Sequence, residues 1–209
     1  MTRPVFSRTE LNHARDNTLG AYERGAEGWD RHRTRNLAER PWLDRFLDHV
    51  PDEGTVLDLG CGAGDPIAGY LLAANRSVVG IDFSEPMLQL ARARYPQAEF
   101  CRGDLRDLSL DGTFHGALSW DGSFHLSIAE QRRLIATLAE HLEPGAPLMM
   151  TIGDEHGETI GHVEGEPIYH ASLSLDEYRE HLSATGFANI DIVVEARPID
   201  RIVLFARRQ

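Results

Sequence analysis

The sequence predicts one doubly wound α/β domain, in which helices pack on both faces of a mostly parallel sheet. Short apolar, β-branched runs alternate along the chain with segments of helical periodicity. The first of these runs leads directly into a glycine-rich turn and the start of a helix, an arrangement that forms a ligand site at the carboxyl edge of a parallel sheet. A length of 209 residues suits one such domain and is too short for two.

The first fifty residues are predicted to be helical after a polar start. Residues 1–20 are polar and poorly periodic, so we expect part of this segment to be mobile. Between residues 19 and 35 the apolar positions recur at helical spacing, which places Tyr22 and Trp29 on one face. A second amphipathic helix is predicted over residues 41–50.

A glycine turn follows the first predicted strand, residues 55–59. Gly60, Gly62 and Gly64 have no Cβ, so the backbone can turn sharply and approach a ligand closely. Residues 66–74 then read as the start of a helix, with a proline at an early helical position. The alternative is that the glycines serve packing alone.

The charges around this turn indicate the kind of ligand. A dinucleotide site requires G-x-G-x-x-G, so that backbone N–H groups meet a pyrophosphate. Here the third glycine position is Asp65, and Asp58 adds a second carboxylate beneath the turn. Carboxylates repel a diphosphate and suit a cationic ligand.

Two further strands end in acidic residues. Residues 77–81 form the second strand and lead to Asp82, whose carboxylate is placed to accept both hydroxyls of a ribose. A solvated strand-end acid is the alternative. Ser84 is predicted to cap the next helix, which contains Met87 and extends to residue 94. The third strand, residues 98–102, leads to Asp104.

The rest of the chain supplies the remaining elements. Strands are predicted over residues 114–120, 147–152, 189–194 and 202–205. Helices are predicted over residues 128–141 and 174–185, the second with a capping box of Ser174 and Glu177.

Composition excludes several classes of function. The net charge is -12 and the pI about 5.2, so we expect neither nucleic acid nor an anionic membrane as a partner. The chain contains no lysine, which excludes a Walker A or Schiff-base lysine. Two cysteines make no disulfide framework, and we see no signal peptide, so we expect a cytoplasmic protein.

The segment V-L-D-L-G-C-G-A-G-D-P resembles the first motif of the class I, Rossmann-like S-adenosylmethionine-dependent methyltransferases. The resemblance runs from about Tyr22 to Phe205 and is greatest to the small, stand-alone bacterial members. It implies a seven-stranded sheet with an antiparallel last strand. It also implies a helical lid over residues 1–50 and a catalytic domain over residues 51–209.

The resemblance assigns S-adenosylmethionine as the cofactor, with S-adenosylhomocysteine as its product. The residues that it implies for binding are Tyr22, Trp29, Arg33, Asp58, Gly60, Cys61, Gly62, Asp82, Phe83, Met87, Gly103, Asp104, Leu105 and Trp120. Arg33 is expected to meet the cofactor carboxylate, and Asp104 with the following N–H to contact the adenine.

Residues 120–125 follow the fourth strand, which lies beside the first in a doubly wound sheet, so we expect them at the floor of the reaction site. His125 is the candidate general base, and Asp121 the second candidate catalytic residue, placed to position an acceptor amine or the cofactor ammonium. A histidine bonded to backbone in a turn is the alternative. Phe124, His125, Tyr169 and His170 are the candidate substrate-binding residues.

Residues 151–170 are glycine-rich and acidic and contain three histidines. These histidines lack the spacing of metal ligands, so we expect no metal site. A loop this long in a compact domain usually has a function. We therefore expect it to cover the active site and shape the acceptor pocket.

These observations predict a methyltransferase that acts on oxygen or nitrogen of a small-molecule acceptor, as a monomer or homodimer. A non-catalytic regulatory protein that binds S-adenosylmethionine or S-adenosylhomocysteine is the alternative. A nicotinamide-dependent oxidoreductase is disfavoured by Asp65. The segment S-W-D-G stands where enzymes that methylate DNA amino groups carry N-P-P-Y or D-P-P-Y.

Overall fold

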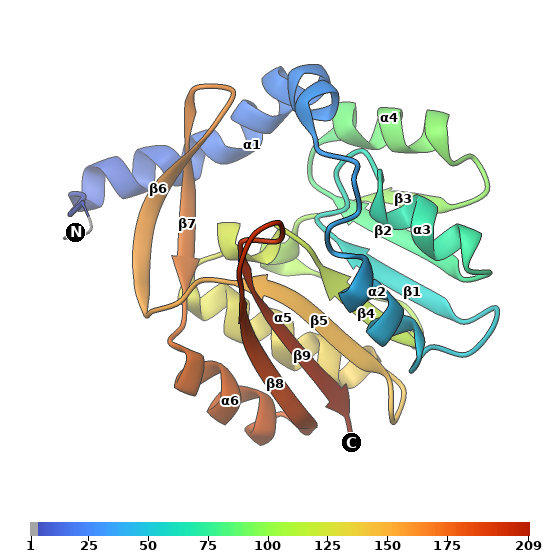
Figure 1. Cartoon of the computed structure of the whole chain (residues 1–209). Coiled ribbons are helices and arrows are strands. Elements are labelled where there is room, and N and C mark those ends of the chain that lie inside the picture. The colour runs from blue at the N-terminus through green and yellow to red at the C-terminus, as the bar shows by residue number, and fades with distance from the viewer. Residues whose placement is uncertain (1–3) are drawn as a thin grey trace.

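A seven-stranded sheet forms the centre of the protein, whose computed structural model describes residues 4–209 (Figure 1). The strand order is β3-β2-β1-β4-β5-β9-β8. All neighbours are parallel except those of β9, which runs antiparallel to both β5 and β8. The strands are β1 (Thr55–Leu59), β2 (Ser77–Asp82), β3 (Glu99–Arg102), β4 (Gly116–Ser119), β5 (Pro147–Ile152), β8 (Phe187–Glu195) and β9 (Arg201–Arg208). The predicted fold class and its antiparallel last strand are confirmed.

Helices cover both faces of the sheet because its strands are apolar on both sides. Val56 and Leu118 face the helices α2 (Arg40–Leu47), α3 (Ile67–Ala73) and α4 (Glu85–Arg94). Their neighbours Leu57 and Ala117 point the other way, to α5 (Ile128–His141) and α6 (Leu175–Ala184). Two short 3₁₀ helices, η1 (Leu105–Asp107) and η2 (Ser123–His125), follow β3 and β4.

The first helix is longer than the sequence predicts. α1 (Arg8–His32) begins at Ser7, whose hydroxyl and the carboxylate of Glu10 form a capping box. Residues 8–18 are therefore helical, although their sequence was interpreted as poorly periodic, while residues 1–3 lie outside the described part. The missed signal is the helical spacing of the buried residues Leu11, Ala14 and Thr18.

The segment predicted as a long loop is a β-hairpin. β6 (Gly157–Val163) and β7 (Glu166–Ser172) pair antiparallel as a separate two-stranded sheet. The two residues between them, Glu164 and Gly165, both have positive φ, which is typical of a tight hairpin turn. Most of residues 151–170 is therefore regular, with residues 153–156 as the irregular link between β5 and the hairpin inserted after it.

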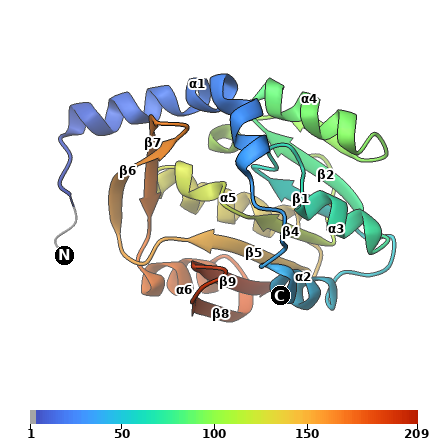
Figure 2. The ribbon, with the colours of Figure 1, turned by 45° about the horizontal axis from the view of Figure 1, so that its top comes forward.

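The hairpin and α1 lie side by side in both ribbon views (Figures 1 and 2). Arg24 of α1 pairs with Glu166 of β7, and Arg8 lies 2.8 Å from Glu158 of β6. The buried Thr18 hydroxyl donates to the carbonyl of Ala14 and accepts from the backbone N–H of Tyr169 at 3.1 Å. α1 is thus held on the hairpin by buried as well as exposed polar contacts.

The hydroxyl of Thr18 is expected to contribute to the docking of α1. Thr18→Val leaves the buried N–H of Tyr169 without its acceptor, which should lower the free energy of unfolding by about 1–2 kcal/mol. Urea unfolding measures this, and hydrogen exchange should show faster opening of α1. Thr18→Ser keeps the hydroxyl and serves as the matched control. Equal losses in both variants would contradict this account.

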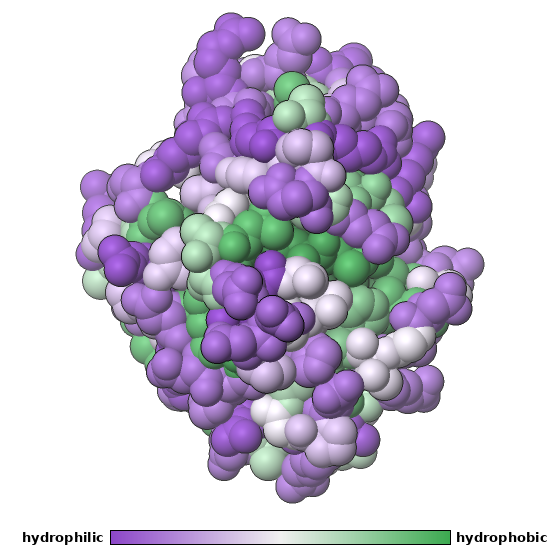
Figure 3. Space-filling view, turned by 90° about the vertical axis from the view of Figure 1, so that its right-hand side faces the viewer, coloured by the Kyte–Doolittle hydropathy of each residue, from purple (hydrophilic) through white to green (hydrophobic). Residues whose placement is uncertain are grey.

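The surface is mostly hydrophilic, but apolar residues gather in a band across the middle of one face (Figure 3). No described helix is both long and apolar enough to cross a membrane.

Candidate functional site

A cavity of about 270 Å³ lies where β1, β2 and β4 end, beneath α1. All the residues that the sequence assigns to a cofactor line it, and so do the two candidate catalytic residues. They are Tyr22, Trp29, Arg33, Asp58, Gly60, Cys61, Gly62, Asp82, Phe83, Met87, Gly103, Asp104, Leu105, Trp120, Asp121 and His125. Parallel topology brings together those that end or follow the strands, because the carboxyl ends of the strands meet at one edge. Tyr22, Trp29 and Arg33 instead come from α1 and its C-terminal end.

The glycine turn has the geometry that its sequence predicts. Gly60, Gly62 and Gly64 all have positive φ, between 52° and 75°. A Cβ on Gly60 would lie 3.0 Å from the Cα of Gly122, in the turn after β4. Only glycine lets these two turns approach so closely.

Asp82 supports the turn and faces the cavity. Its carboxylate accepts hydrogen bonds from the backbone N–H groups of Gly62 at 2.8 Å and Ser84 at 2.9 Å. Burial raises the pKa of Asp82 to about 6, although these backbone bonds oppose the rise. Ser84 caps α4 by position, but its own hydroxyl makes no capping bond.

Asp58 lies in the same cavity and is also buried. Burial and the nearby Asp82 raise the pKa of Asp58 to about 7, while Arg33 partly opposes the rise. Because the two buried carboxylates repel each other, one of them retains a proton below about pH 7 when no ligand is bound. A ligand that brings a positive charge or hydroxyl donors is favoured at this site for the same reason.

In the described part of the chain, Arg33 is one of three arginines that line the cavity, together with Arg15 and Arg106. Its guanidinium lies over the ring of Trp29 at 5.4 Å and 3.5 Å from the carboxylate of Asp121. Its Nε is buried and has no hydrogen-bond partner among residues 4–209. A buried donor without a partner indicates that an acceptor belongs beside it.

Two other carboxylates are already paired within the protein. Asp65 accepts hydrogen bonds from Arg35 and from the hydroxyl of Tyr95. Burial would raise the pKa of Asp65, but these bonds outweigh it and lower the pKa. The electrostatic case against a diphosphate therefore rests on Asp58 and Asp82 rather than on Asp65.

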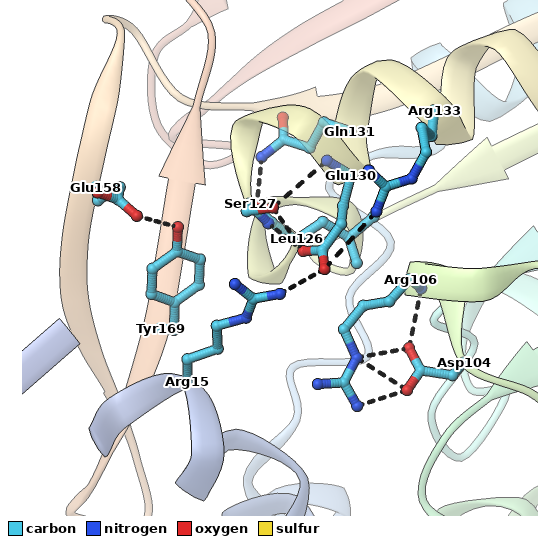
Figure 4. A network of polar contacts seen from close by, with 10 residues as sticks. All are labelled: Arg15, Asp104, Arg106, Leu126, Ser127, Glu130, Gln131, Arg133, Glu158 and Tyr169. Carbon is cyan, nitrogen blue, oxygen red and sulfur yellow. Dashed lines mark hydrogen bonds and ion pairs between the residues drawn. The ribbon is translucent and has the colours of Figure 1, made fainter. Parts of the chain in front are cut away.

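Asp104 is bound by the guanidinium of Arg106, which also lines the cavity (Figure 4). The predicted contact of Asp104 with a ligand would therefore have to share its carboxylate with this arginine.

The protonation pattern of His125 follows from its partners. Its Nδ1 lies 2.9 Å from the carbonyl oxygen of Tyr169, which can only accept, so Nδ1 carries the hydrogen. Nε2 is then the acceptor for the hydroxyl of Tyr22, 2.9 Å away. Burial lowers the pKa of His125, which keeps the ring neutral. The lone pair of the candidate base is thus directed at Tyr22.

Tyr22→Phe removes this hydroxyl and is expected to leave a buried imidazole nitrogen unpaired. The free energy of unfolding should fall by about 1–2 kcal/mol, measured by urea denaturation. Tyr70→Phe is the control, because the Tyr70 hydroxyl bonds Asp44 at an exposed position and its loss should cost less. A smaller loss at position 22 than at 70 would contradict the arrangement.

Asp121 is held between two arginines. Its carboxylate accepts hydrogen bonds from Arg201 at 2.7 Å (Oδ1) and 3.2 Å (Oδ2), and Oδ2 also lies 3.5 Å from the guanidinium of Arg33. Its backbone N–H donates to the Thr151 hydroxyl at 2.8 Å, and its φ is 57°. The side chain is therefore fixed in position and ion-paired.

Three of the four candidate substrate-binding residues do not line the cavity. Tyr169 is 1% exposed, and its hydroxyl donates to Glu158 at 2.7 Å. The rings of Phe124 and His170 pack with that of His125 at centroid distances of 4.8–4.9 Å, behind the cavity wall. Among the four, only His125 reaches the wall.

The first half of α1 supplies wall residues that sequence reasoning missed, because it treated this segment as irregular. They are Arg15, Asp16, Thr18 and Leu19. Arg15 also reaches Glu130 at the start of α5 (Figure 4). A second signal that could have found them is the capping box at Ser7, which starts the helix before them.

Within the described part of the chain, no three histidine, cysteine or acidic side chains gather as a metal site would require.

Residues 56–145 match a family model described as a methyltransferase domain. One relative is a dTDP-3-amino-3,4,6-trideoxy-alpha-D-glucopyranose N,N-dimethyltransferase of Streptomyces venezuelae, 32% identical over 109 residues that cover 51% of this chain and 46% of the relative. Another is an O-methyltransferase of Pyrenophora dematioidea, 28% identical over 77% of this chain and 66% of the relative. The match to the first relative thus spans about half of its length.

Solved structures have the same fold. A S-adenosylmethionine-dependent methyltransferase from Clostridium acetobutylicum aligns with a TM-score of 0.70 at 13% identity, covering 90% of this chain and 98% of that one. The amino pentose methyltransferase CalS10 from Micromonospora echinaspora aligns with a TM-score of 0.68 at 21% identity over the full length of both chains. At these identities the likeness shows the architecture.

Proposed function

We infer that this chain, which contains a methyltransferase domain in the fold of the class I S-adenosylmethionine-dependent enzymes, transfers a methyl group to oxygen or nitrogen of a small molecule. One observation carries the proposal: two buried carboxylates and an arginine whose buried Nε has no hydrogen-bond partner among residues 4–209 share a cavity at the carboxyl edge of the sheet. The relatives include N,N- and O-methyltransferases, which supports these two acceptor atoms.

The residues of the cavity suit the chemical groups of S-adenosylmethionine. Asp82 accepts hydroxyls, and would hold the ribose. Asp58 would meet the ammonium, and Arg33, with its free Nε, would meet the carboxylate. Leu105 and Asp104 would lie toward the adenine. A diphosphate in the same cavity would face Asp58 and Asp82, which disfavours a dinucleotide.

When bound, this cofactor supplies a methyl group on a positively charged sulfur. The chain contributes alignment of the acceptor and exclusion of water, which are the main needs of such a displacement. α1 closes the cavity from above, and we propose residues 1–50 as a lid on a domain formed by residues 51–209.

His125 stays our candidate proton acceptor. Because its Nε2 already accepts from Tyr22, it would receive a proton from the cavity through the hydroxyl of Tyr22. Asp121, fixed by Arg201, would position the acceptor. Phe124, Tyr169 and His170 would support His125 from behind rather than touch the substrate.

A cytoplasmic location is part of the same proposal, supported by the absence of a disulfide between Cys61 and Cys101, which are both free.

Calorimetric titration of the purified protein with S-adenosylmethionine, S-adenosylhomocysteine and reduced nicotinamide dinucleotide tests the proposal. We expect micromolar binding of the first two and none of the third. Binding of the dinucleotide alone, or of none of the three, would refute it.

A further inference from the structure

A second cavity, of about 480 Å³, adjoins the first. The two share four wall residues: Trp29, Arg33, Trp120 and Asp121. The outer wall comes from the segment after α1, from Glu164 in the β6–β7 turn, from the β8–β9 connection with Arg197, and from Arg201 at the start of β9. The shared wall therefore lies where β4 ends, beside the glycine turn after β1.

This position suits a methyl acceptor. The first cavity is bounded above by α1 and on one side by the Tyr22–His125 pair, so neither side leaves an obvious approach for a second molecule. The second cavity also reaches Trp120 and Asp121, and its other walls include residues of the segments 34–39 and 197–201, which do not line the first cavity. A molecule lying in it would meet the wall that both cavities share.

The second cavity contains an arginine that no acidic side chain of the described residues engages. Two of the acids in its wall pair with other arginines: Asp121 with Arg201 at 2.7 Å and Glu39 with Arg33 at 3.8 Å. Glu164 lies 3.2 Å from His32, which balances its charge only when the imidazole is protonated. In contrast, the exposed guanidinium of Arg197 makes no hydrogen bond or ion pair with any residue from 4 to 209. All the N–H donors of Arg197 are therefore available to bind a ligand in this cavity.

Arg201 can add to the same contact. It bonds Asp121 through Nε and Nη2 and the carbonyl of Asp200 through Nη1, which leaves one hydrogen on each terminal nitrogen. The exposed carboxylate of Asp200 is the remaining acid of the wall and opposes an anion.

We propose that the second cavity binds the methyl acceptor and that the acceptor carries a carboxylate, which Arg197 and Arg201 hold. The inference rests on the proposed function, because it takes the first cavity as the cofactor site. It adds the chemical class of the acceptor and the residues that select it.

Paired ligands test the carboxylate preference. Succinate is compared with succinamide, and 4-hydroxybenzoate with 4-hydroxybenzamide, by calorimetry on the full chain with and without S-adenosylhomocysteine. Two of the three tryptophans, Trp29 and Trp120, line the second cavity. Quenching of tryptophan fluorescence therefore measures the binding of succinate independently of calorimetry. We expect at least one carboxylate to bind more tightly than its amide.

Three variants test the residues. Arg197→Gln is expected to weaken carboxylate binding roughly five- to tenfold and to leave amide and S-adenosylhomocysteine binding unchanged. Asp200→Asn should strengthen carboxylate binding about twofold, because it removes the opposing charge. Arg179→Gln, on the exposed side of α6, is the matched control and should change nothing.

The inference is overturned if neither carboxylate binds with higher affinity than its amide. It is also overturned if Arg197→Gln binds the carboxylates with the same affinity as the unaltered protein. Failure of S-adenosylhomocysteine to bind the unaltered protein would instead refute the proposed function, so the two failures are distinguishable.

Discussion

Replacement of Asp82 by asparagine is expected to weaken the binding of S-adenosylhomocysteine more than tenfold. A neutral amide cannot accept two hydroxyl hydrogens as a carboxylate does, and a hydrogen bond to a charged group contributes about 1.5–3 kcal/mol. Calorimetric titration of the variant measures the loss directly.

The fold should survive this change. Burial already raises the pKa of Asp82, so removal of its charge offsets part of the loss of the backbone hydrogen bonds from Gly62 and Ser84. Urea unfolding checks this, and Asp111→Asn at an exposed position is the matched control. Unchanged affinity in Asp82→Asn would remove Asp82 from the proposed ribose contact.

Replacement of Asp58 by asparagine should stabilise the ligand-free protein while weakening its binding of cofactor. The pKa of Asp58 is about 7 in the folded state, above its ordinary value of 3.8. Between these two values the folded state retains a proton that the unfolded state has lost, so the free energy of unfolding falls as the pH rises. The full destabilisation by the ionised Asp58 is present above about pH 7. Asparagine has no charge and avoids this destabilisation.

The expected gain in the free energy of unfolding is on the order of 2–4 kcal/mol at pH 8 and close to zero near pH 4. Urea unfolding of both proteins at the two pH values measures it. A gain that is the same at both values, or a less stable variant at pH 8, would contradict a buried ionised Asp58. Lower affinity for S-adenosylmethionine in the same variant would show that the site sacrifices stability for binding.

The candidate base illustrates what a sequence cannot decide. His125 was predicted as a candidate base from its place after the fourth strand, and in the structure it lines the cavity. Which of its nitrogens carries the hydrogen depends on Tyr22 and on the carbonyl of Tyr169, which are 103 and 44 residues away. No local pattern could show that its lone pair is already engaged.

The two segments whose structure was predicted wrongly have weak local signals. The first turns of α1 bury small residues such as Ala14 and Thr18, so they lack the large apolar stripe that marks most amphipathic helices. The β6–β7 hairpin depends on the turn at Glu164 and Gly165, and most of its strand residues are only partly buried. Each segment is ordered by packing on the other.

By itself the sequence determined the sheet, its helices and the residues that gather at the carboxyl ends of β1, β2 and β4. These follow from local periodicity, glycine conformation and parallel topology, which act over a few residues at a time. Tertiary structure alone decided how charges pair around the site: Asp65 with Arg35, Asp121 with Arg201, and Arg197 with no partner among the described residues. Such pairing depends on distances between groups far apart in the chain, which composition and spacing do not encode.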